Sequence, residues 1–99
     1  MEIRVSAKND NVVPLLKQQR KEFEMAFLLM KRKQAALIDK VSVRTAEDPY
    51  TVIIDIRFVQ FFDNSMLYKG FYLFAKRQIV KDLSTVGIKK KDIKIEVVK

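Results

Sequence analysis

Residues 50–62 read YTVIIDIRFVQFF and carry the strongest strand signal of the chain. β-Branched and aromatic residues dominate this stretch, and such side chains favour an extended backbone. Its even positions, among them Val52, Ile54 and Ile56, place an apolar row on one face. The stretch therefore predicts a strand that buries one face in a core.

Three shorter segments are also predicted to be strands. Glu2–Ala7 and Lys40–Thr45 alternate polar and apolar residues, and Ile93–Val98 is rich in isoleucine and valine. Alternation with a period of two is typical of a strand with one buried face.

A long helix is predicted from Val12 to Ile38, because apolar residues recur on one stripe at about 100° per residue. Pro14 falls in its first turn, where a missing N–H costs least. The stripe contains Val12, Leu16, Phe23, Ala26, Phe27, Met30, Leu37 and Ile38. A second apolar patch points away from this stripe and needs cover from another element or molecule: Met25, Leu28 and Leu29. This patch is a candidate dimer interface.

The segment Met66–Ala75 fits two assignments. Its aromatic residues favour a strand, and we prefer a hairpin in which it pairs with residues 50–62 and Phe58 faces Phe71. The opposite face of that hairpin adds three aromatic candidates for the dimer interface: Tyr68, Tyr72 and Phe74. At helical spacing, however, Phe71, Tyr72 and Ala75 also line up.

These elements predict one α+β domain over residues 1–99. A short helix over residues 76–86, closed by Gly87, completes the set. One long helix and one short helix then pack on a mostly antiparallel sheet in the order β-α-β-β-β-α-β. If residues 66–75 are helical instead, the order becomes β-α-β-β-α-β, the ferredoxin-like pattern.

The composition points away from catalysis. The 99 residues include no histidine and no cysteine. The chain therefore lacks the commonest general base, a thiolate nucleophile and the usual zinc ligands. It carries no glycine-rich phosphate loop, and its carboxylates form no pair suited to acid–base work. We expect a non-enzymatic protein with no catalytic residue, no metal site and no cofactor.

Positive charge is concentrated in the last third of the chain. The net charge is +8, and residues 64–99 carry +6 of it, from 9 basic and 3 acidic side chains. Such a segment attracts nucleic acid or an acidic protein surface. The candidate nucleic-acid contacts are Lys69, Lys76, Arg77, Lys89, Lys90 and Lys91.

The location and stability of the protein are also predicted from composition. No apolar run has the length of a membrane span, and the first residues do not resemble a signal peptide. An intracellular protein with no membrane partner is therefore expected. High charge, no cysteine and few glycines favour a heat-stable protein.

The chain resembles the small proteins encoded by filamentous viruses of hot-spring archaea, of the lipothrixvirus and rudivirus kind. The resemblance rests on length, on the cysteine-free charged composition and on the helix KQQRKEFEMAFLLMKRK at residues 17–33. It implies a stable, often dimeric protein in the host cytoplasm, with a host defence factor as a candidate partner. The predicted function is a viral accessory protein that acts through protein–protein contacts. The alternative is a nucleic-acid-binding module that uses the basic C-terminal third.

Overall fold

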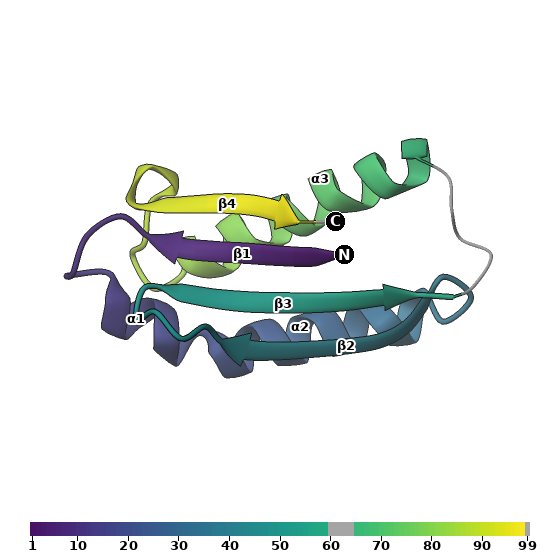
Figure 1. The fold of residues 1–99 in the computed structure, drawn as a ribbon, viewed down its shortest axis with the longest axis horizontal. Coiled ribbons are helices and arrows are strands. Elements are labelled where there is room, and N and C mark those ends of the chain that lie inside the picture. The colour runs from purple at the N-terminus through teal and green to yellow at the C-terminus, as the bar shows by residue number, and fades with distance from the viewer. Residues whose placement is uncertain (60–64, 99) are drawn as a thin grey trace.

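The structure is a computed structural model that describes residues 1–59 and 65–98, with side chains for 1–59 and 69–98. Within these residues, four strands form one antiparallel sheet in the order β2-β3-β1-β4 (Figure 1). The strands are β1 (Glu2–Ala7), β2 (Ile38–Thr45), β3 (Thr51–Phe58) and β4 (Ile93–Val98). The helices are α1 (Val13–Gln18), α2 (Arg20–Lys33) and α3 (Ser65–Ser84), and a 3-10 turn (Lys90–Asp92) precedes β4.

The core lies between the sheet and the helices. Ile54 on β3 pairs with Ile3 on β1 and with Val43 on β2, so one apolar row crosses the three strands. Buried side chains of the helices belong to the same core as this row: Leu16, Phe23, Phe27, Met30, Ala75, Ile79 and Leu83. Burial of such apolar side chains is the main force that holds helices on a sheet.

The predicted α+β class is confirmed, but the preferred strand assignment for residues 66–75 is wrong. Ser65–Ser84 form one helix of 20 residues, so the element order is the ferredoxin-like alternative. The hairpin cannot form because both edges of β3 are already paired, one with β1 and the other with β2. The expected contact between Phe58 and Phe71 does occur, with ring centroids 5.1 Å apart, but it joins a strand to a helix.

The single helix predicted over residues 12–38 is also wrong, because the structure has two helices and a strand there. Gln19 separates α1 from α2, and its N–H is shared between the carbonyls of Leu15 and Leu16. Such a tightened turn is common at helix ends. The second helix ends at Lys33, and Ile38 begins β2, where it pairs with Phe58 and is buried. Packing in the sheet therefore overrides the helical spacing of Ile38.

The strand predictions hold well outside this region. Glu2–Ala7 and Ile93–Val98 are confirmed as strands with the predicted bounds. The strand predicted at Lys40–Thr45 begins earlier, at Ile38, and β3 spans Thr51–Phe58 of the predicted 50–62. Residues 60–62 lie outside the part of the chain that the structure describes.

Gly87 closes the end of α3 as predicted. Its φ of 85° lies in the left-handed region, which glycine adopts without steric cost. The Ile88 N–H donates to the Leu83 carbonyl at 3.0 Å, and the Gly87 N–H donates to the Ser84 carbonyl at 3.2 Å. This pair of bonds is a Schellman motif, and it turns the chain toward the lysines at 89–91.

Candidate functional site

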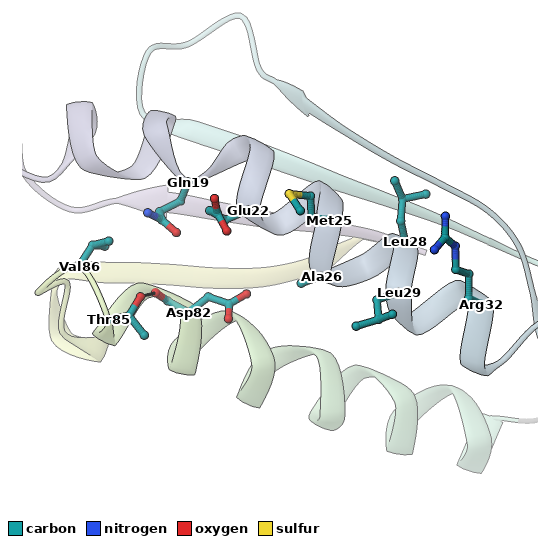
Figure 2. Close-up of a pocket in the computed structure, with 10 residues that line it drawn as sticks. All are labelled: Gln19, Glu22, Met25, Ala26, Leu28, Leu29, Arg32, Asp82, Thr85 and Val86. Atoms are coloured by element: carbon teal, nitrogen blue, oxygen red, sulfur yellow. Dashed lines mark hydrogen bonds between the residues drawn. The ribbon is translucent and has the colours of Figure 1, made fainter.

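A groove of about 690 Å³ lies between α2 and the end of α3 (Figure 2). Its apolar lining includes Met25, Leu28 and Leu29, whose exposed fractions are 66%, 37% and 52%. Phe23 and Phe27 of the same helix are fully buried in the core. The second apolar patch expected from the sequence is therefore present and uncovered on the single chain.

The groove carries charges of opposite sign at its two ends. Glu22 on α2 and Asp82 on α3 lie toward one end, and Arg32 lies at the other end of α2 (Figure 2). Glu22 and Arg32 are ten positions apart, which is about 15 Å along a helix. An apolar centre between charged ends is the usual arrangement of a protein–protein contact surface.

The two carboxylate oxygens of Asp82 differ in their hydrogen bonding among the described residues. Its Oδ1 accepts a hydrogen bond from Gln78 Nε2 at 3.0 Å. Its Oδ2 is buried and has no hydrogen-bond partner among the described residues. Burial raises the pKa of Asp82, and the nearby charge of Glu22 raises it further, while the Gln78 hydrogen bond opposes the shift. The site therefore disfavours the ionised form of this side chain.

At a concentration where the chain is monomeric, we expect Asp82→Asn to stabilise the protein at neutral pH. Because the folded-state pKa is raised, the folded chain holds this proton more tightly than the unfolded chain does. Stability is then lost as the pH rises from the ordinary aspartate pKa through the raised one. The asparagine side chain does not titrate, and its amide oxygen still accepts from Gln78.

Urea unfolding across a pH series measures this effect, with Glu47→Gln in the exposed β2–β3 turn as the control. The advantage of Asp82→Asn should shrink as the pH falls toward the ordinary aspartate pKa. A variant that is less stable than the original chain at neutral pH contradicts the prediction.

A second feature is a cluster of four lysines around a separate hollow of about 500 Å³. The hollow is lined by Lys8, Lys76, Lys90 and Lys91, with Ile93 and Ile95 of β4. Among the described residues, no carboxylate lies within 4.0 Å of any of these four ammonium groups. The four charges are therefore available to an anionic ligand.

Strand pairing brings these lysines together from distant parts of the sequence. Ala7 pairs with Ile93 at the end of the β1–β4 ladder, and the Lys8 N–H donates to the Asp92 carbonyl at 2.9 Å. The Asp92 carboxylate accepts from the Lys89 N–H at 3.1 Å and holds the 3-10 turn that carries Lys90 and Lys91. Lys76 comes from α3. Lys8 was missed in the sequence because it lies outside the basic C-terminal third.

The open face of the sheet is different in character, because its charges neutralise each other. Arg44 binds both Glu2, at 3.3 Å, and Asp55, at 3.0 Å, and Arg4 binds Glu2 at 2.7 Å. Ile53 lies between Arg4 and Arg44 across the ladder and is buried at 2% exposure. Sheets that bind RNA on this face stack bases on aromatic side chains, and on this face β1 and β3 carry none.

The remaining predicted site residues are dispersed. Phe74 is 57% exposed on α3 and does not line the groove, whereas Tyr72 packs against the core. The side chain of Tyr68 lies outside the described residues. The aromatic sheet face predicted from these three residues does not exist, because the segment is helical.

The predicted cations are divided in the same way. Lys76, Lys90 and Lys91 meet at the lysine cluster. Lys69, Arg77 and Lys89 are exposed but do not line its hollow. The fold thus selects half of the predicted nucleic-acid contacts and adds Lys8.

Comparison with known proteins adds no relative. No family model matches the chain, and neither a curated protein nor a solved structure matches it. In the described part of the chain, no group of histidine, cysteine and acidic side chains is arranged to hold a metal ion. No helix in that part is long and apolar enough to cross a membrane. The surfaces themselves are therefore the basis for a proposed function.

Proposed function

We propose that the chain is a non-enzymatic binding protein that acts through protein–protein contacts at the groove between α2 and α3. The observation that carries this proposal is the exposure of Met25, Leu28 and Leu29 side by side in one groove. Soluble chains rarely leave large apolar side chains grouped on the surface unless another molecule covers them. The charged ends of the groove would form the polar rim of such an interface.

The resemblance to small archaeal virus proteins suggests the class of partner. It makes a protein of the host cell, such as a defence factor, one predicted target, and it places the contact inside the host cytoplasm. This origin stays a prediction. The groove bears on the kind of partner alone, because an apolar surface suits a protein partner.

An affinity pulldown that compares the original chain with groove variants tests whether the groove binds a partner. The tagged chain is incubated with extract of the cells that make it, and bound proteins, including untagged copies of the chain, are identified by mass spectrometry. The variant Leu28→Lys/Leu29→Lys should lose the bound protein, because two charges would be buried in the apolar contact. The matched control is Leu73→Lys/Phe74→Lys, which changes two similarly exposed apolar residues on α3 outside the groove.

The outcome depends on which variant loses binding. Thermal unfolding first establishes that both variants fold. Loss in the groove variant with retention in the control supports the proposal. Equal capture by the groove variant and the original chain, or no specific capture at all, overturns it.

A second candidate function is favoured by the lysine cluster. Four lysines line one hollow, with no carboxylate within 4.0 Å of their ammonium groups among the described residues. Three of the four come from the third of the sequence that holds most of the excess positive charge. Phosphate groups are the ligands that such a cluster recognises. We propose nucleic-acid binding through Lys8, Lys76, Lys90 and Lys91 as the alternative, with an affinity that falls steeply with salt.

A further inference from the structure

We propose that the occupant of the α2–α3 groove is a second copy of this chain, bound through the same groove in a two-fold symmetric dimer. The inference rests on the proposed function, because it names the partner of that same surface. It is carried by the order of residues along α2.

The groove-lining residues of α2 are arranged symmetrically about residue 27. Glu22 and Arg32 lie five positions to either side of it, Met25 and Leu29 lie two positions away, and Ala26 and Leu28 flank it. In a two-fold symmetric interface, if one residue contacts a second residue of the partner subunit, the second residue contacts the first one of the partner subunit in turn. Two antiparallel copies of one helix that pack around a two-fold axis require contact residues placed symmetrically about a central position, as they are here about residue 27.

An antiparallel pair of α2 helices would match charge with opposite charge. Glu22 would meet Arg32 of the partner subunit at each end, and Met25 would meet Leu29 of the partner subunit near the centre. A parallel pair would instead set Glu22 against Glu22 of the partner subunit, and juxtaposed like charges are unfavourable. The sequence of the helix thus selects the antiparallel arrangement.

Asp82 adds an independent reason for a cation at the acidic end of the groove. Its Oδ2 is buried without a partner among the described residues, and Asp82 lies on the α3 side of the groove toward the same end as Glu22 on the α2 side (Figure 2). Arg32 of the partner subunit would arrive at this end with five donors. A guanidinium near the two carboxylates would offset the repulsion between them.

A charge exchange between the two ends tests the dimer. Light scattering coupled to size exclusion, over a concentration series, measures the dissociation constant. Glu22→Arg alone and Arg32→Glu alone should each raise it by about tenfold or more, since each sets like charges together at both ends. The double variant Glu22→Arg/Arg32→Glu should return it to within about threefold of the original value, because the pairs are restored in reverse.

Lys21→Glu is the matched control, because Lys21 is exposed on the same helix but does not line the groove. It should leave the dissociation constant unchanged. Rescue in the double variant supports the inference. A dimer that survives both single variants, or a single variant that the second change does not rescue, overturns it.

The two proposals fail in different ways. If the original chain is a monomer at every concentration, the second copy is excluded as occupant. The proposed function still stands in that case if Leu28→Lys/Leu29→Lys abolishes capture of another protein. If neither self-association nor capture depends on the groove, both proposals fall.

Discussion

Replacing Phe27 by alanine is expected to destabilise the fold by about 3–5 kcal/mol. Phe27 is fully buried, and its ring lies in the core beneath α2. Its removal loses apolar burial and leaves a cavity that rigid strands on the other side fill only in part. Urea unfolding followed by circular dichroism measures the change.

Leu29→Ala is the matched control, because it shortens an apolar side chain on the same helix that is 52% exposed. At a concentration where the chain is monomeric, this change should cost less than about 0.5 kcal/mol. If Phe27→Ala leaves too little folded protein to measure, Phe27→Leu keeps most of the volume and should cost about 1 kcal/mol. Equal losses for Phe27→Ala and Leu29→Ala would contradict the assignment of the core face.

Reversing charge at the lysine cluster is expected to weaken nucleic-acid binding by about 10- to 100-fold at low salt. Lys90→Glu/Lys91→Glu converts two of the four cations around the hollow into anions. For duplex DNA, each neutralised phosphate contributes about −0.9 to the slope of log affinity against log salt. Four lysine contacts would give a slope of about −3.6, and the variant should lose at least half of it.

The control for this experiment changes the net charge by the same amount elsewhere. Lys33→Glu/Lys40→Glu alters exposed lysines of α2 and β2 that do not line the hollow. Fluorescence anisotropy with a labelled duplex over a salt series follows all three proteins. No binding by the original chain at low salt, or an equal loss in both variants, would exclude the cluster as a nucleic-acid site.

The helix α3 shows why one part of the fold could not be read from the sequence. The apolar residues of 66–75 fit a strand and a helix about equally, because short aromatic-rich segments satisfy both periods. The choice was made by β1, which takes the edge of β3 that the hairpin would have needed. A pairing between residues that lie some fifty positions apart, such as Ile3 and Ile54, leaves no local signal in either segment.

The candidate sites also differ in how far the sequence could predict them. The exposed patch of Met25, Leu28 and Leu29 was predictable, because it depends on the phase of one helix relative to its own buried stripe. That Asp82 and Val86 complete a groove beside this patch depends on where α3 packs. The lysine cluster likewise needs three segments of the chain to meet, and charge counts in the sequence reveal only that cations are abundant.

The sequence alone predicts an α+β chain with no histidine and no cysteine, with its first and last strands at 2–7 and 93–98 and with a helix that carries two apolar faces. These properties are local, since they follow from side-chain chemistry and from periods of two or 3.6 residues. The tertiary structure decided that residues 65–84 are helical, that α2 ends at Lys33 and that Lys8 joins Lys76, Lys90 and Lys91. Each of these depends on which strand edge is free and which segments share the core, and that competition is settled only when the whole chain packs.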